Sequence, residues 1–278
     1  MRAAIFQPPY PRCGEASASL QWMLTKLDAL SKGCADIVVL PEYSNCLGAE
    51  SREEILSAIR GEGRKLLESC SAAAGRLGAI IMAGVVTEDE TGHFHNQLMV
   101  VETDKAPYFP YSKNYPVEAE FQEGFLPGKA PGVFEINGIR YGAAICFDFY
   151  FPELFAHYME SRIDVLIIPS LQRRETAERL HYLARARAFD CGCTLLRSSV
   201  AMPDCENIAG RSMVIGPDGI IKADAGGRPG VLFTEFDPKD RFIQPASYDR
   251  PGQIDDYRET RLRVKQIVSV FNDKSKED

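Results

Sequence analysis

Short apolar segments alternate with helical patterns along the chain. Nine runs of β-branched or apolar residues, each bounded by turn residues, predict strands. These runs cover residues 3–6, 36–40, 79–86, 97–101, 140–145, 165–168, 194–198, 212–215 and 231–236. Strands that alternate with helices in this way are typical of an α/β fold.

Apolar residues at helical spacing predict the helices between these strands. Five of them, from Leu20 to Leu30, share one face of the first helix. Two further patterns cover residues 59–77 and 176–189, and Pro152 suits the first turn of a helix over 152–162. Each helix therefore has an apolar face with which to cover a sheet.

Two glycine-containing turns predict hairpins, so antiparallel strand pairs are expected beside parallel ones. They lie at residues 90–92 and 216–219, each between neighbouring strands. No repeat or linker interrupts residues 1–272, which we interpret as one domain. Residues 273–278 are polar throughout and are expected to form a C-terminal tail.

Composition and charge narrow the range of partners. Hydrophobic residues make up 45% of the chain and charged residues 26%, as in an ordinary globular protein. The net charge of -7 argues against nucleic acid or an anionic membrane as the partner and favours a small-molecule substrate. No segment approaches the roughly 18 unbroken apolar residues of a membrane span.

The eight cysteines are interpreted as reduced thiols of a cytoplasmic protein. They lack the paired spacings of a zinc site, so no metal is expected. Cys191 and Cys193 form the one close pair, and alternation in a strand would place both on one face. Two small core residues are the favoured interpretation of that pair.

Cys146 is a candidate nucleophile because of its place in the pattern. It closes an apolar strand and comes shortly before Pro152, which begins a helix. A sharp turn between strand and helix exposes a side chain and leaves backbone N–H groups free to meet an oxyanion. The alternative is a buried, inert cysteine, since free cysteine is among the most buried residue types.

Glu42 and Lys113 supply complementary chemistry. Glu42 follows the apolar run Val38-Val39-Leu40, where a buried carboxylate needs a partner, and strand ends are where α/β proteins place their sites. Lys113 lies in a loop with Tyr111 and Tyr115. Taken singly, a capping glutamate and a solvated surface lysine are the commoner interpretations.

Taken together, Glu42, Lys113 and Cys146 resemble the Glu-Lys-Cys triad of the nitrilase superfamily, the carbon–nitrogen hydrolases. The resemblance extends to Leu40-Pro41-Glu42, Asn96, Leu126-Pro127-Gly128 and Ile145-Cys146-Phe147-Asp148. It implies a four-layer α-β-β-α sandwich with two mixed β-sheets. It also implies cleavage of a non-peptide C–N bond through a cysteine thioester, without metal or organic cofactor.

The resemblance implies further site residues. Glu123 resembles the family's second glutamate, which positions the lysine, although Glu118 and Glu120 are close enough to compete. Asp148 resembles the amidase and carbamoylase pattern, so amide or N-carbamoyl substrates are favoured over nitriles. Tyr115 stands where the family often has histidine, which puts the local substrate contacts in doubt.

Four aromatic residues flank the triad and are candidate substrate-binding residues, namely Tyr43, Tyr115, Phe147 and Tyr150. By the same resemblance, the helices over 152–162 and 176–189 are candidate contacts in a homodimer or larger even assembly. Two rival functions stay open. One is a Cys-His hydrolase that uses a histidine at position 93, 95, 157 or 181, and the other is an inactive nitrilase-like scaffold that binds a ligand or protein.

Overall fold

Two six-stranded sheets form the centre of the molecule. The computed structural model describes residues 1–12, 17–202, 205, 208–245 and 254–263. The first sheet runs β12 (Gly230–Glu235), β1 (Arg2–Gln7), β2 (Ile37–Leu40), β3 (Ile80–Glu88), β4 (Phe94–Val101) and β5 (Tyr108–Ser112). The second runs β11 (Ile221–Asp224), β10 (Met213–Ile215), β9 (Thr194–Ser198), β8 (Val165–Pro169), β7 (Ile139–Ala143) and β6 (Gly132–Ile136).

Both sheets are mixed. In the first, β1, β2 and β3 are parallel, and in the second β7, β8 and β9 are parallel. The flanking strands are antiparallel, including β3 with β4 and β10 with β11, which the two predicted hairpin turns join. The carboxyl ends of the parallel strands are where the chemistry-bearing residues follow.

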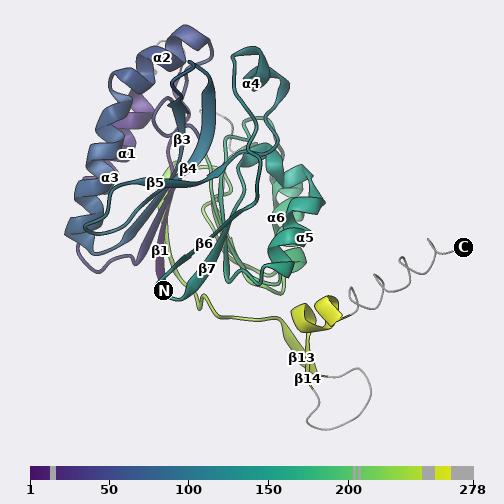
Figure 1. Cartoon of the computed structure of the whole chain (residues 1–278). Helices are drawn as coiled ribbons and strands as arrows, with labels where there is room; N and C mark the ends of the chain where they lie inside the picture. Colours follow the sequence, from purple (N-terminus) through teal and green to yellow (C-terminus); the bar gives the residue numbers. More distant parts are fainter. Residues whose placement is uncertain (13–16, 203–204, 206–207, 246–253, 264–278) are drawn as a thin grey trace, which may run out of the picture.

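Helices cover the outer face of each sheet (Figure 1). α1 (Ala18–Asp28) and α3 (Gly63–Leu77) pack on the first sheet, and α5 (Pro152–Glu160) and α6 (Ala177–Cys191) pack on the second. The shorter elements are α2 (Arg52–Arg60), α4 (Glu118–Gln122) and the 3-10 helix η1 (Cys146–Tyr150).

The four-layer arrangement follows from strands that are apolar on both faces. In β1, Ala3 and Ile5 belong to the core between the two sheets, whereas Ala4 and Phe6 pack under α1 and α3. Successive strand residues point to opposite faces, so an unbroken apolar strand needs cover on both sides. The predicted four-layer α-β-β-α sandwich with two mixed sheets is confirmed.

Some predicted elements are wrong in detail. The pattern over 59–77 predicted one helix, but the chain forms α2 and α3 with a break at Gly61. Gly63 begins α3 so close to a neighbouring loop that an added Cβ would lie 2.3 Å from the Asn45 carbonyl oxygen. Cys191 ends α6 rather than sharing a strand with Cys193, although both are buried.

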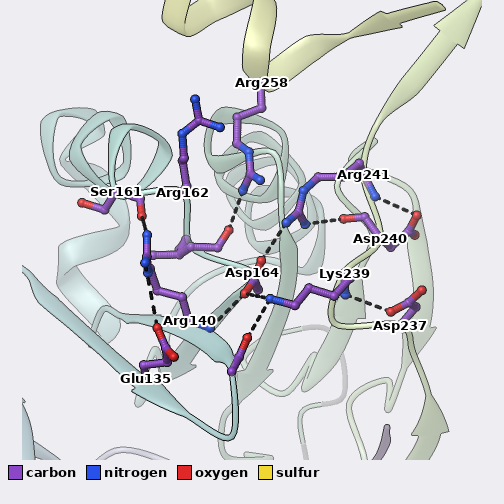
Figure 2. A network of polar contacts seen from close by, with 12 residues as sticks. Glu135, Arg140, Ser161, Arg162, Asp164, Asp237, Lys239, Asp240, Arg241 and Arg258 are labelled. Carbon is purple, nitrogen blue, oxygen red and sulfur yellow. Dashed lines mark hydrogen bonds and ion pairs between the residues drawn. The ribbon is translucent and has the colours of Figure 1, made fainter.

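A third, two-stranded sheet lies away from the other two in Figure 1. It consists of β13 (Ile243–Pro245) and β14 (Ile254–Asp256). Polar contacts hold the segments before and after this small sheet to the start of β8 (Figure 2). The Asp164 carboxylate accepts from Lys239 and Arg241, and Arg258 donates to the Ile163 carbonyl. The predicted domain end at 272 and the tail 273–278 lie outside the described residues.

Among the residues that the structure describes, no helix is long and apolar enough to cross a bilayer. No group of three or more histidine, cysteine, aspartate or glutamate side chains within that part of the chain is arranged to hold a metal ion.

Candidate active site

Three loops from the two sheets bring Glu42, Lys113 and Cys146 together. Glu42 follows β2 and Lys113 follows β5 in the first sheet, and Cys146 follows β7 in the second. Lys113 Nζ lies 2.9 Å from Glu42 Oε1. The Cys146 thiol lies within electrostatic reach of both Glu42 and Lys113. A carboxylate, an ammonium and a thiol far apart in sequence therefore share one site.

Gly84 on β3 permits the close approach of the two sheets at this point. A Cβ added there would lie 2.6 Å from Glu42 Cα and 2.8 Å from Pro169 Cβ, where β8 ends. Contacts that short do not occur between real side chains, so any larger residue would push Glu42 or β8 aside. The position of Glu42 thus depends on a glycine that carries no chemistry of its own.

Glu120, not Glu123, is the second glutamate at the lysine. Glu120 Oε2 lies 2.8 Å from Lys113 Nζ, and Glu120 Oε1 accepts from Asn96 and from the Tyr43 hydroxyl. The assignment of Glu123 to this place is wrong because Glu120 lies on the inner side of the short helix α4, where its carboxylate also accepts from Val117 N. Glu123 is half-buried at the end of α4.

Lys113 is buried between these two carboxylates, with only 3% of its side chain exposed. Burial by itself lowers the pKa of a lysine, but Glu42 and Glu120 outweigh it and raise the pKa of Lys113 above its usual value. The ammonium is therefore charged at neutral pH. The solvated surface lysine that base rates favour is excluded by this burial.

Glu42 has one oxygen bound and one oxygen free. Oε1 accepts from Lys113 Nζ at 2.9 Å and from Asn96 Nδ2 at 2.8 Å. Oε2 is buried and has no hydrogen-bond partner within the described part of the chain. A buried carboxylate oxygen without a donor is costly, and the charge of this carboxylate acts on the Cys146 thiol.

Cys146 lies in a strained turn at the start of η1. Its φ of 48° is in the left-handed region, which residues with a side chain seldom adopt and which clusters at functional sites. The residue as a whole is partly exposed. Burial of the thiol has the largest effect and raises its pKa, and the Glu42 charge raises it further. Lys113 and the backbone N–H of Leu171 oppose that rise. The thiol is therefore protonated at neutral pH.

Asp148 fastens the cysteine turn to the lysine loop. Its Oδ2 accepts from the Tyr111 hydroxyl and from Ile145 N, both at 2.7 Å, and its Oδ1 accepts from Tyr115 N at 3.0 Å. Burial raises the pKa of Asp148 to about 6, against the effect of these donors. One carboxylate thereby sets the distance between the chain segments that carry Lys113 and Cys146.

The four aromatic candidates lie around the triad in different roles. Tyr43 donates its hydroxyl to Glu120, and Tyr150 donates to Glu175 at 2.6 Å. Tyr115 stacks on Phe151 with ring centroids 3.7 Å apart. Phe147 packs its ring 5.4 Å from that of Tyr150. All four side chains are partly exposed, and each is held by a contact within the protein.

Asn96 is a site residue whose role the sequence analysis did not recognise. The sequence signal was present, since Asn96 belongs to the quoted family pattern, but a single asparagine on a strand gives no role. In the structure its Nδ2 bridges Glu42 Oε1 and Glu120 Oε1, at 2.8 Å from each. It holds the two carboxylates on opposite sides of Lys113.

Comparisons with known proteins show to which family the chain belongs. The carbon–nitrogen hydrolase family model matches residues 2–241. The chain is 28% identical to omega-amidase NIT2-B of Xenopus laevis, over 76% of this chain and 84% of that protein. It is also 28% identical to a deaminated glutathione amidase of Synechocystis, over 78% and 85%.

Among solved structures, XC1258 from Xanthomonas campestris, a CN-hydrolase superfamily protein, superposes with a TM-score of 0.70 at 22% identity, covering 84% of this chain and 89% of that one. That likeness concerns the fold. The family match spans most of the chain and includes all three triad positions. The protein belongs to the carbon–nitrogen hydrolase family.

Proposed function

We propose that this protein hydrolyses the C–N bond of a small-molecule amide or N-carbamoyl compound, with Cys146 as nucleophile, Glu42 as general acid and base, and Lys113 as the electrostatic partner. The observation that carries the proposal is the arrangement of Glu42, which has one oxygen held by Lys113 and one buried oxygen without a donor among the described residues, within electrostatic reach of the Cys146 thiol. The amidase activity in the names of the related proteins supports an amide substrate.

The raised pKa of Cys146 determines how the first step proceeds. The resting thiol is protonated, so it needs a base as it attacks. Glu42 Oε2 takes the S–H proton, and the sulfur bonds to the substrate carbonyl carbon. The carbonyl oxygen becomes an oxyanion beside Lys113 and the backbone N–H of Phe147. Glu42 then protonates the nitrogen, the C–N bond breaks, and ammonia or an amine leaves the thioester.

Hydrolysis of the thioester uses the same groups. Glu42 accepts a proton from water, and the resulting hydroxide bonds to the thioester carbon. The C–S bond breaks, the carboxylic acid product leaves, and Glu42 returns the proton to the Cys146 sulfur. Glu120 and Asn96 touch no reacting atom in this scheme. They position Glu42 and Lys113, and Asp148 positions the cysteine turn.

A substrate panel with one variant tests the proposal. Release of ammonia is measured for aliphatic amides, ω-amides, N-carbamoyl amino acids and nitriles, with the wild type and with Cys146→Ala. We expect turnover of at least one amide or carbamoyl compound and its loss in the variant. Undiminished turnover by Cys146→Ala, or nitriles as the only substrates, would contradict the proposal.

The same panel separates the rival functions. A protein that turns over no compound while a mild alkylator fails to modify Cys146 would be the inactive scaffold. A Cys-His hydrolase would place a histidine at the thiol, but the charged groups that act on Cys146 are Glu42 and Lys113. His181 instead lies 2.6 Å from Asp224, and His95 lies 3.0 Å from Asp89.

A cytoplasmic location and a homodimer or larger even assembly remain part of this proposal. The seven cysteines that the structure describes are all unpaired, which supports a reducing compartment. Light scattering tests the assembly, since a monomer at micromolar concentration would contradict it. The expected partner is a small molecule, with neither nucleic acid nor membrane involved.

A further inference from the structure

Arg52 joins three segments that are far apart in the sequence. It is the first residue of α2 and is half-buried. Its NH1 donates to the Glu123 carbonyl at 2.8 Å, and its NH2 donates to the Gly92 carbonyl at 2.5 Å. Glu123 follows α4, and Gly92 lies in the turn between β3 and β4. One guanidinium therefore holds the start of α2, the β3–β4 turn and the end of α4 together.

The Arg52 side chain is itself fixed at both of its ends. Ser51 and Glu54 form a capping box around the first turn of α2, which determines where the helix begins. The guanidinium carbon lies 4.6 Å from the centre of the Phe94 ring on β4, in a cation–π contact. The capping box holds the backbone of Arg52, and the ring holds its charged group. Arg52 is therefore a rigid support for the segments that it joins.

Gly124 permits Arg52 to approach the chain just after α4. Its φ of 88° lies in the left-handed region, and a Cβ added there would lie 2.9 Å from Arg52 NH1. The Gly124 carbonyl accepts from Phe94 N at 3.1 Å, and Leu126 N donates to the Phe94 carbonyl at 2.9 Å. The chain that leaves α4 is thus bound to Arg52 on one side and to β4 on the other.

The contacts at the end of α4 matter because α4 carries Glu120. A helix of five residues is marginal by itself, since helix nucleation is costly, so contacts with other segments determine its direction. The Glu120 carboxylate lies 2.8 Å from Lys113 Nζ. A tilt of α4 would move this carboxylate away from the ammonium. The hydrogen bond from Arg52 to the Glu123 carbonyl therefore contributes to the distance between Glu120 and Lys113, and a positive charge suits the carbonyl end of a helix.

We propose that Arg52 is a positioning residue for the reaction: by fixing the end of α4 it sets the place of Glu120 against Lys113. This inference rests on the proposed function and adds a residue that donates to none of the triad. Without Arg52, α4 shifts, Glu120 supports Lys113 less well, and the oxyanion loses part of its stabilisation. The effect therefore falls on kcat and leaves KM nearly unchanged.

The competing explanation is that Arg52 only stabilises the fold. The segment after α4 is also held by a small apolar cluster, in which the Phe125 ring lies 5.2 Å from that of Phe94 and 5.9 Å from that of Tyr43. If this packing alone fixed α4, the loss of Arg52 would lower Tm without changing kcat. A test must therefore separate the position of Glu120 from stability.

The first experiment measures kcat and KM with the best amide substrate for the wild type, Arg52→Met and Arg52→Lys. We expect kcat to fall about tenfold in Arg52→Met, because small displacements of positioning groups lower the rate strongly, and KM to stay within about twofold. Arg52→Lys keeps the charge and one donor but loses the planar fork, so its kcat is expected to fall less.

Arg60→Met is the matched control. Arg60 is the last residue of the same helix α2, and it donates to the Glu88 carboxylate at 2.8 Å. Its side chain is 59% exposed, so its ion pair contributes little to stability. The kcat of this variant is expected to stay within about twofold of the wild type.

A double-mutant cycle tests whether Arg52 acts through Glu120. The kcat of Glu120→Gln is compared with that of the double variant Arg52→Met, Glu120→Gln. If Arg52 serves only to place Glu120, its loss in this background lowers kcat by less than about twofold, because the two losses are not independent. A further tenfold loss in the double variant, or an unchanged kcat in Arg52→Met with a lowered Tm, overturns the proposal.

A measurement without substrate separates this inference from the proposed function. If the wild type turns over no amide, the proposed function fails, and the rate at which iodoacetamide alkylates Cys146 is measured by peptide mapping instead. Lys113 lowers the pKa of the thiol, so a misplaced Lys113 slows alkylation. A slower rate in Arg52→Met, with no further slowing when Arg52→Met is added to Glu120→Gln, supports the positioning role. Equal rates in the wild type and Arg52→Met, or further slowing in the double variant, overturn it.

Discussion

Two ion networks in this molecule consist of the same types of side chain but differ in burial and in which group lies at the centre. At the site, Lys113 lies between Glu42 and Glu120, with 3% of the lysine side chain exposed. In the network of Figure 2, Asp164 lies between Lys239 and Arg241, and 54% of the Lys239 side chain is exposed. At the site two carboxylates bind one cation, whereas Asp164 is one carboxylate that binds two cations.

The difference lies in which atoms are left free. Both oxygens of Asp164 are bound: Oδ2 accepts from Arg140 N and Lys239, and Oδ1 accepts from Arg241. Glu42 Oε2 is buried without a partner in the described residues. A carboxylate that serves stability has both oxygens satisfied, as Asp164 does, whereas a carboxylate proposed for catalysis can keep one acceptor without a donor.

The largest effect is expected from Glu42→Gln. The amide keeps the size of the side chain but cannot take the thiol proton, and Glu42 acts in both steps of the proposed reaction. We expect kcat/KM to fall by at least about 10³-fold, within the range of general acid–base catalysis. Steady-state ammonia release measures it, with circular dichroism to verify the fold. Activity within tenfold of the wild type would contradict the role of Glu42.

Lys113→Met should affect both activity and stability. It removes the oxyanion partner, with an expected loss of about 10²-fold in kcat. It also leaves two carboxylates buried without their cation, which costs about 3–5 kcal/mol of unfolding free energy. Lys239→Met is the matched control, because Asp164 retains Arg241 and the lysine is half-exposed. A loss below about 1 kcal/mol is expected there by urea unfolding. Equal losses in the two variants would refute the contrast.

Glu120→Gln and Glu123→Gln sharpen the assignment of the second glutamate. Glu120 holds Lys113 and accepts from Asn96 and Tyr43, so its change should misplace Lys113 and lower kcat by about 10- to 10²-fold. Glu123→Gln should stay within about twofold, like most substitutions near the surface. Assays of kcat for the two purified variants, run in parallel, decide which glutamate positions Lys113. A larger loss of kcat in Glu123→Gln than in Glu120→Gln would favour Glu123 as the second glutamate.

Asp164→Asn should leave activity at pH 7 unchanged but alter the dependence of stability on pH. Although burial raises the pKa of Asp164, its three donors hold it below the ordinary value of 3.8. The carboxylate therefore stabilises the fold above that pH, and the contribution is lost as the pH falls through the lowered value. Denaturant unfolding at a series of pH values should show the gap between wild type and variant narrowing below pH 3.8. A constant gap would contradict this.

Much of the fold was predictable, because strands that are apolar on both faces must be covered on both sides and few folds allow this. The strand at 194–198 has the same limits in the structure, and the helices at 152–162 and 176–189 differ only at their ends. Edge strands were harder. β6 alternates buried and exposed residues, with Val133 exposed at 37%, so it lacks the long apolar run that marks a central strand.

The triad residues were found from three separate sequence contexts, but side-chain direction was not available from them. Glu120 and Glu123 lie on either side of one short turn of helix, and only the direction of α4 places Glu120 inward.

The most direct test of the account is the covalent intermediate at Cys146. A steady-state reaction with the best amide substrate is quenched in acid, and the protein is measured by intact mass and peptide mapping. The proposed reaction predicts a mass increase equal to the acyl group on the Cys146 peptide, absent from Cys146→Ala and from the other seven cysteines. An acyl group on a different residue, or turnover by Cys146→Ala at the wild-type rate, would contradict it.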